Sequence, residues 1–227
     1  IPGTTWSISG EKKIAQGATT GFAIKTDGTL WSWGDGSIGR KGDNTTTQRS
    51  SPVQIPGTNW SQISSFEISS FATKTDGTLW SWAYNGNGQL GVNDRTNRSS
   101  PTQIPGTNWK SASASYFAAG ATKTDGTLWM WGHNNHGQLG QNNRINRSSP
   151  VQIPGTNWNK TYPCKRESMM ASKNDGTLWV WGRNTINGQL GQNNRISYSS
   201  PVQIPGTNWN AEQGGMGYFS ALIMKNE

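Results

Sequence analysis

The sequence is poor in charged residues, in cysteine and in long apolar segments. Only 14% of its 227 residues are charged, against about 25% in an average globular protein. The single cysteine, Cys164, excludes an internal disulfide. No apolar run reaches the length of about eighteen residues that a membrane-spanning helix needs, and no signal peptide is visible. Composition alone leaves the localisation open.

Repetition is what the sequence has in abundance. The segment Thr-Asp-Gly-Thr-Leu-Trp-x-Trp occupies Thr26 to Trp33 and returns, with one Asn for Thr, at residues 75–82, 124–131 and 174–181. Asp-Gly predicts a β-hairpin with a two-residue turn, because positive φ at the turn matches the twist of the flanking strands. Trp31 and Trp33 are two residues apart, so an extended strand places both on one face.

A second motif, Ile-Pro-Gly-Thr-x-Trp, begins at residues 1, 55, 104, 153 and 204. A repeat of about fifty residues with one supersecondary unit per copy predicts a β-propeller or another repeat array. In the third copy we expect strands at residues 108–113, 118–123, 127–132 and 149–153, and no helix anywhere in the chain. Four short antiparallel strands per copy are typical of a propeller blade.

The copies predict one all-β repeat domain over residues 1–227. Its repeats cover approximately residues 1–54, 55–103, 104–152 and 153–203, followed by a partial copy at 204–227. The fifth copy has only the first two strands, so we expect four full blades and half of a fifth. The open edge would be covered by a longer chain or by a partner.

The thirteen tryptophans all belong to the repeats. A large apolar side chain that recurs in register predicts a core between blades rather than a platform for a ligand. The residues to which we assign this structural role in the Trp-x-Trp pairs are Trp31, Trp33, Trp80, Trp82, Trp129, Trp131, Trp179 and Trp181.

A long connection precedes the fourth strand of each blade. It carries Gly-Gln-Leu-Gly at residues 88–91, 137–140 and 188–191. The first repeat has Gly39-Arg40-Lys41-Gly42 instead. Because the leucine is missing, we expect this loop to pack differently or not at all.

No residue set predicts catalysis, a metal or a cofactor. His133 and His136 are the only histidines, too few for a zinc site, and solvated loop residues are the simpler interpretation. The aspartates of the Asp-Gly turns are expected to satisfy local backbone groups. Two matches to the dinucleotide-binding fingerprint, at residues 34–39 and 86–91, lack the βαβ context that this site requires.

Eight of the nine arginines fall in the connections between the third and fourth strands, which emerge on one face of a propeller. The ninth, Arg166, falls in a connection between a first and a second strand, on the same face. On the opposite face each repeat has a lysine two residues before the turn aspartate, which predicts near-neutral pairs. The candidate binding residues in the long connections are Arg40, Arg49, Arg95, Arg98, Arg144, Arg147, Arg183 and Arg195.

This distribution concentrates the net charge of +8 on the long-loop face. Such a face would attract an anionic partner in a salt-dependent manner. In the alternative interpretation the arginines fasten loops between blades by hydrogen bonding to neighbouring carbonyls.

The order of motifs resembles the regulator of chromosome condensation repeat, and most closely its bacterial and bacteriophage members. The resemblance is carried by Asn-Trp, Lys-Thr-Asp-Gly-Thr-Leu-Trp-x-Trp-Gly, Asn-x-x-Gly-Gln-Leu-Gly and Arg-Ser-Ser-Pro-Val-Gln-Ile, and it covers essentially the whole chain. It implies a propeller, typically a larger, seven-bladed ring, that serves as an interaction platform. Exchange activity on a small GTPase, which the nuclear founding member is known for, requires a wedge inserted between strands, and no repeat here has one.

Together these features predict a non-enzymatic binding protein, in a virion or as a secreted adhesive, that contacts a protein or a larger assembly. An acidic glycan is another candidate partner for the arginines, and nucleic acid is not favoured. Two further functions stay open: a lectin with one shallow pocket per blade, and a regulator of chromatin or of a small GTPase.

Overall fold

The computed structural model describes residues 5–6, 13–163, 167–216 and 221–225. The first Ile-Pro-Gly segment, Cys164 and Arg166 lie outside these residues. All described strands belong to antiparallel sheets. The first two sheets contain β1 (Ile14–Gln16), β2 (Thr20–Ile24), β3 (Leu30–Gly34) and β4 (Arg49–Gln54), then β5 (Trp60–Phe66), β6 (Ser69–Lys74), β7 (Leu79–Ala83) and β8 (Arg98–Ile104).

The remaining sheets repeat the same order. They contain β9 (Trp109–Ala114), β10 (Ala118–Lys123), β11 (Leu128–Gly132) and β12 (Arg147–Ile153), then β13 (Trp158–Pro163), β14 (Ser168–Lys173), β15 (Leu178–Gly182) and β16 (Tyr198–Ile204), and finally β17 (Trp209–Met216) and β18 (Ala221–Lys225). The predicted fold class is confirmed: the described residues form four four-stranded blades and a two-stranded half blade.

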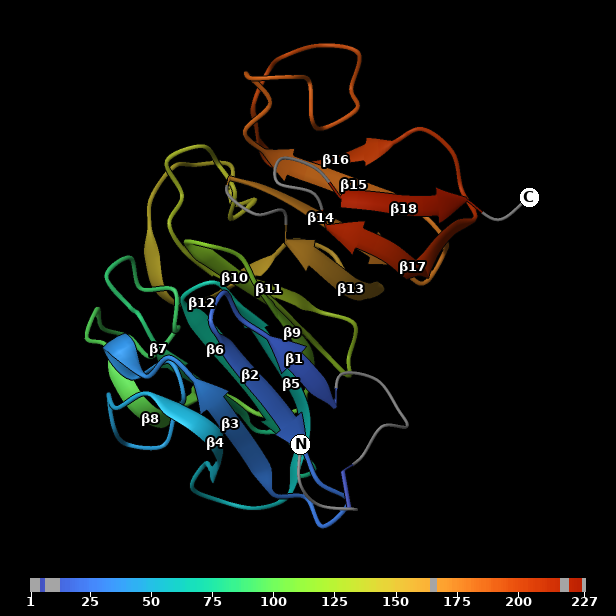
Figure 1. Cartoon of the computed structure of the whole chain (residues 1–227). Coiled ribbons are helices and arrows are strands. Elements are labelled where there is room, and N and C mark those ends of the chain that lie inside the picture. Colours follow the sequence, from blue (N-terminus) through green and yellow to red (C-terminus); the bar gives the residue numbers. More distant parts are fainter. Residues whose placement is uncertain (1–4, 7–12, 164–166, 217–220, 226–227) are drawn as a thin grey trace.

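The sheets follow one another in chain order as the blades of an incomplete propeller (Figure 1). The first strand of each blade is the innermost, because β1 contacts β5, β5 contacts β9, β9 contacts β13 and β13 contacts β17. The fourth strand lies at the outer edge of its sheet. The described residues contain no helix that is long and apolar enough to cross a membrane.

Neighbouring blades share their hydrophobic cores. One buried cluster contains Phe22 and Ile24 from the first blade together with Trp60, Ile63 and Trp82 from the second. The second strands β6, β10 and β14 are buried at nearly every position, because both faces of these sheets are covered by neighbouring structure. The fold therefore depends on burial between sheets rather than within any single one.

The hairpin that joins the second and third strands differs from the expected two-residue turn. Lys25 N–H donates to the Thr29 carbonyl and Gly28 N–H donates to the Lys25 carbonyl. Among residues 25–29 of this loop, only Gly28 has positive φ, at 78°. The prediction of a two-residue turn was wrong, because the loop has three residues and ends in a glycine bulge.

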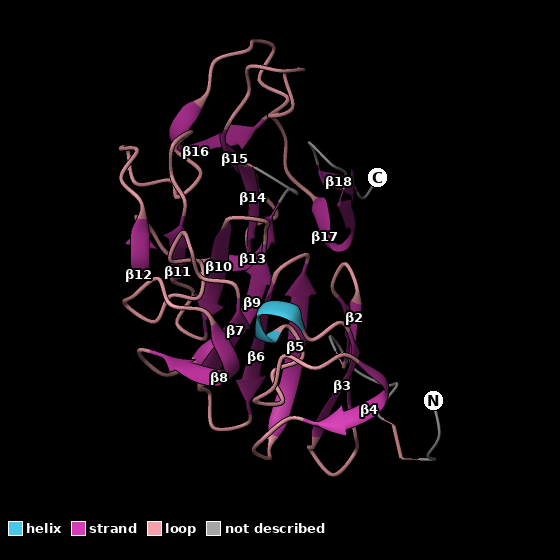
Figure 2. Ribbon diagram, turned by 60° about the vertical axis from the view of Figure 1, so that its left-hand side comes forward, coloured by secondary structure: helices cyan, strands magenta, loops and turns pink. Residues whose placement is uncertain are grey.

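One short helix occurs among the described residues, where no helix was expected. A 3-10 turn, η1 (Ser37–Gly39), interrupts the long connection of the first blade. It lies against β7 and β8 of the second blade (Figure 2). The long loop of one blade therefore covers the outer strands of the next.

Candidate interaction surfaces

A buried asparagine holds each long connection of the second, third and fourth blades in shape. Asn134 Oδ1 accepts from the Leu139 N–H, while its Nδ2 donates to the carbonyls of Asn143 and Ile145 at 3.1 Å. Asn85 and Asn184 make equivalent bonds. A side-chain amide can both donate and accept hydrogen bonds, so it can satisfy the backbone N–H and carbonyl groups of a loop that is not part of a sheet. These loops are therefore ordered structures that present their tips in a defined position.

Successive blades are fastened through backbone groups on the long-loop face. The N–H groups of Asn44, Asn93 and Asn142 donate to the carbonyls of Ser99, Ser148 and Ser199 in the following blade. All three asparagines adopt positive φ, a conformation that asparagine tolerates better than most residues. Each loop tip is consequently docked on the next blade.

The arginines fall into two groups by exposure. Arg40, Arg98 and Arg183 are half-buried and pair with acids of their own blade, namely Asp35 at 3.1 Å, Asp94, and Glu167 at 2.5 Å. These pairs lie within blades, whereas the alternative interpretation of the sequence had the arginines fasten loops between blades. Arg147 is also half-buried, and its Nε has no hydrogen-bond partner among the described residues.

The exposed arginines are Arg49, Arg95, Arg144 and Arg195. None of the four has an ion pair with a described residue. Arg95, Arg144 and Arg195 occupy the same position of successive loops, directly after the residue that bonds the buried asparagine. Two of them precede exposed isoleucines, Ile145 at 57% and Ile196 at 63% exposure.

The first blade replaces the buried leucine of its long loop with a buried ion pair. Lys41 occupies the place of Leu90, Leu139 and Leu190 and is completely buried. Its ammonium contacts Asp43, and Asp43 also accepts from the N–H and hydroxyl of Thr45. The expectation that this loop packs differently is confirmed, because an ion pair fills the leucine site, and the alternative that it does not pack at all was wrong.

The two tryptophans of each Trp-x-Trp pair have different surroundings. The second one is buried in the later blades: Trp82, Trp131 and Trp181 are fully covered, and each donates its Nε1–H to a carbonyl of the preceding blade's loop. Trp33, in the first blade, is only half-buried. It lines a hollow together with Ile14 and Gly21.

The first tryptophan of each pair is half-buried and belongs to a hydrogen-bonded chain. Trp129 Nε1 donates to the Thr127 hydroxyl at 2.9 Å, and that hydroxyl donates to Asp125 Oδ1 at 2.7 Å. The hydroxyl and N–H of Thr127 hold the pKa of the Asp125 carboxyl below its ordinary value. Blades one, two and four repeat the chain, which fixes the turn to the indole.

A lysine lies between two indoles in each repeat. Lys74 Nζ is 4.8 Å from the ring centre of Trp60 and 4.6 Å from that of Trp80. The same arrangement is formed by Lys25, Lys123 and Lys173. No ion pair joins these lysines to the turn aspartates among the described residues. The lysines therefore make cation–π contacts, while each still helps to lower the pKa of its turn aspartate through its charge.

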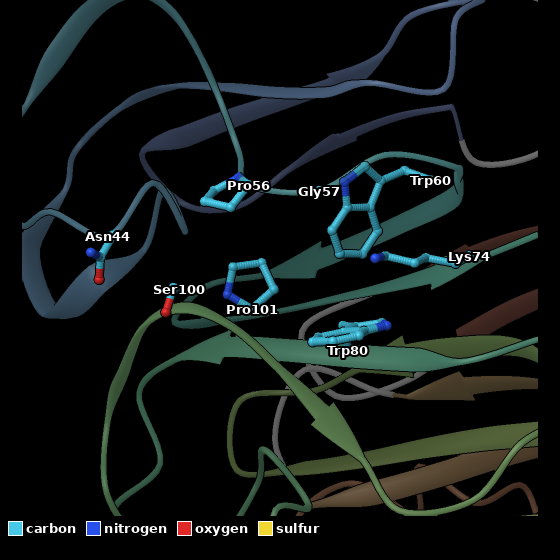
Figure 3. A pocket seen from close by; sticks show the side chains of 8 residues that line it. All are labelled: Asn44, Pro56, Gly57, Trp60, Lys74, Trp80, Ser100 and Pro101. Carbon is cyan, nitrogen blue, oxygen red and sulfur yellow. The ribbon is translucent and has the colours of Figure 1, made fainter.

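Two equivalent pockets lie beside these lysines, at the junctions of blades one with two and three with four. The first has a volume of 410 Å³ and the second 280 Å³. Figure 3 shows the first, with Lys74 between the two indoles and the prolines facing them. Its lining residues are Asn44, Pro56, Gly57, Trp60, Lys74, Trp80, Ser100 and Pro101. Sequence analysis missed this site because it treated every tryptophan as core.

The two histidines make specific contacts in the long loop of the third blade. His133 Nδ1 is 2.9 Å from Gln138 Nε2, and His136 Nε2 is 3.5 Å from the Glu167 carboxylate of the next blade. Burial lowers the pKa of His133. Both histidines are therefore half-buried and in contact with other side chains, unlike the solvated loop residues that the sequence predicted. The described residues hold no cluster of three potential metal ligands.

The blades, their shared cores and their docked loops define a β-propeller of regulator-of-chromosome-condensation type. The model of the "Regulator of chromosome condensation (RCC1) repeat" family matches residues 76–124, 125–166 and 175–212. The chain therefore belongs to this family. The predicted resemblance is confirmed at the level of the repeat.

Solved structures show the same fold. The chain is 23% identical to human WBSCR16, covering 88% of this chain and 55% of that one, with a TM-score of 0.74. Prp20p from Saccharomyces cerevisiae, whose binding to Gsp1p and histones has been studied, is 19% identical over 96% of this chain and 57% of its own, with a TM-score of 0.79. A yeast Prp20 structure with bound Kap60 gives 18% identity, 95% and 54% coverage and the same TM-score of 0.79.

The chain thus spans a little over half the length of these structures. At such identities the likeness establishes the fold alone. No curated protein matches the chain by sequence.

Proposed function

We propose that the chain is a non-enzymatic binding platform whose long-loop face holds a protein partner with an acidic surface. The exposed arginines Arg95, Arg144 and Arg195 carry this proposal, because they recur at one position of successive blades and no described acid neutralises them. Cations held on ordered loops raise the rate and the specificity of association with an anionic surface.

The exposed isoleucines favour a protein over a polyanion as the partner. Ile145 and Ile196 follow directly after Arg144 and Arg195 and are more than half exposed. Protein interfaces combine arginine with apolar side chains, whereas a purely electrostatic surface has no use for exposed isoleucine. A virion or a secreted adhesive assembly is the setting that the sequence suggests for such a partner.

Site-specific photo-crosslinking in the source organism tests this proposal. A crosslinking amino acid at position 145 or 196 should capture the same acidic protein, and one at Thr124, in an exposed turn on the opposite face, should not. Capture should be lost in R95E/R144E/R195E and should weaken as salt is raised. Equal capture from position 124, or capture that the triple substitution leaves unchanged, would contradict the proposal.

A regulator of chromatin or of a small GTPase is the second candidate function. Family membership and the fold shared with Prp20p support it. The regular repeat spacing of about fifty residues leaves no room for an inserted wedge. Release of fluorescent nucleotide from a small GTPase would distinguish this function, and we expect the chain not to accelerate it.

A further inference from the structure

The pockets at the blade junctions are lined by side chains other than the exposed arginines of the long loops. Neither described pocket is lined by any of the eight loop arginines. Each is lined by the long loop of the earlier blade, by the connection between the two blades and by all four strands of the later blade. Their size falls in or near the range of ordinary small-ligand sites.

Each pocket contains hydrogen-bond donors without acceptors. Lys74 Nζ and Lys173 Nζ contact indole faces and have no carboxylate or carbonyl partner among the described residues. Trp60 and Trp158 are 2% exposed, and the Nε1–H of each is buried without a partner. In Figure 3 the nitrogen of Trp60 is on the side of the ring nearest Pro56 and Gly57. The indole N–H groups are covered by protein atoms, so the half-buried lysine ammonium is the donor that a ligand with oxygen acceptors would meet.

The remaining walls are apolar and flat. Pro56, Pro101 and the half-buried Trp80 present ring surfaces, while Asn44 and Ser100 supply an amide and a hydroxyl at the rim. A pyranose ring has one face of C–H groups and an edge of hydroxyls, which matches these two kinds of wall. A carboxylate on that ring would meet the lysine ammonium, forming a charge-assisted hydrogen bond.

The same residues return along the chain. Asn142, Pro154, Trp158, Lys173, Trp179, Ser200 and Pro201 form the second pocket in the positions of the first. Lys123 lies between Trp109 and Trp129 in the same manner at the intervening junction. A regular series of weak sites favours a ligand with a repeating unit, because binding at one site raises the effective concentration at the next.

We propose that the junction pockets bind carboxylated sugar residues of an acidic polysaccharide, with the lysine between the two indoles holding the carboxylate. This inference does not depend on the protein partner proposed for the long-loop face. The net charge of +8 would assist the encounter with a polyanion.

Calorimetry and tryptophan fluorescence with a galacturonic acid oligomer test the proposal, with the methyl-esterified oligomer as the neutral control. The acid oligomer should bind at more than one site per chain and change the indole emission, and the ester should bind at least about tenfold more weakly. Comparable affinity for the ester, or absence of binding by the acid oligomer, would overturn the proposal.

Two triple variants with the same change in net charge separate the pockets from general attraction to a polyanion. K74M/K123M/K173M should weaken binding of the acid oligomer at least about tenfold more than R95A/R144A/R195A does. Methionine keeps an unbranched stem over the indoles, and K74R/K123R/K173R, which keeps the charge, should restore binding if folding is intact. Equal losses in the two triple variants would overturn the assignment, and so would tighter binding of a glutamate-rich peptide than of the oligomer at these lysines.

Discussion

Lys41 and Asp43 form an ion pair buried in the first blade, at the site where the other full blades bury leucine. The exposed fractions of their side chains are 0% and 5%. Removing two charges from water is costly, and such a pair gains little over well-packed apolar residues. The second blade shows the apolar solution at the same positions, with Leu90 and Val92.

Breaking this pair should destabilise the chain strongly. We expect D43A to lower the free energy of unfolding by about 3–5 kcal/mol, because it leaves a buried ammonium without its carboxylate. The double variant K41L/D43V, which copies the second blade, should be as stable as the unsubstituted chain or more stable. Urea denaturation measures both. A double variant less stable than D43A would contradict this account.

The ion pair should also contribute to the pH dependence of stability. Burial raises the pKa of Asp43, but hydrogen bonds from Lys41 and Thr45 and the lysine charge outweigh it, so the net pKa is lowered. A lowered folded-state pKa stabilises the fold above the unfolded-state pKa of about 3.9, and this contribution disappears as the pH falls through the folded-state pKa.

Comparison with K41L/D43V isolates that contribution, since the other aspartates are present in both chains. The stability of the unsubstituted chain relative to the double variant should decrease as the pH is lowered from about 6 to about 3. Urea denaturation at each pH provides the measurement. A difference that stays constant over this range would be incompatible with the ion pair.

The threonine that links a turn aspartate to an indole should matter through its hydroxyl. T127V removes the acceptor of the Trp129 Nε1–H and one donor to Asp125. We expect Tm to fall by about 2–4 °C, whereas T127S, which retains the hydroxyl, should change it much less. If T127V and T127S had the same Tm, the chain of hydrogen bonds would have no net effect on stability.

The buried asparagine of the long loop should be far more sensitive than the exposed arginine beside it. N134A leaves the Leu139 N–H and two loop carbonyls without partners, so we expect a loss of about 3 kcal/mol or more. Arg144 lies in the same loop and has no hydrogen bond to a described residue. R144A should therefore change the free energy of unfolding by no more than about 0.5 kcal/mol. Similar losses for the two variants, measured by urea denaturation, would refute the structural role of Asn134.

Local sequence patterns predicted the blade well. The expected second strand of the third repeat, residues 118–123, coincides with β10, and the other three expected strands overlap β9, β11 and β12. These boundaries follow from turn residues and alternating apolar positions, which act over short distances. The length of the hairpin loop was misjudged, because Asp-Gly suits both a two-residue turn and a three-residue turn with a glycine bulge.

Contacts between blades could not be read from the same patterns. In the sequence, Lys41 indicated only that the first loop lacks the leucine of the other loops. In the structure, Asp43 lies two residues later as its counter-ion, and the pair keeps the loop packed. The sequence places each lysine near a turn aspartate, and it does not show that two other strands bring indoles against the same ammonium group. In each case the partner is selected by packing in three dimensions, where distance along the chain carries little information.

The sequence by itself determined the repeat, the antiparallel blade and the family, because turns, alternation and period are local properties. Only the tertiary structure decided which tryptophans are covered and which line a pocket. Trp82 and Trp80 are two residues apart on one strand, yet Trp82 is enclosed by the preceding blade while Trp80 faces a lysine and two prolines. The physical reason is that burial is set by the neighbouring sheet, whose position no single repeat encodes.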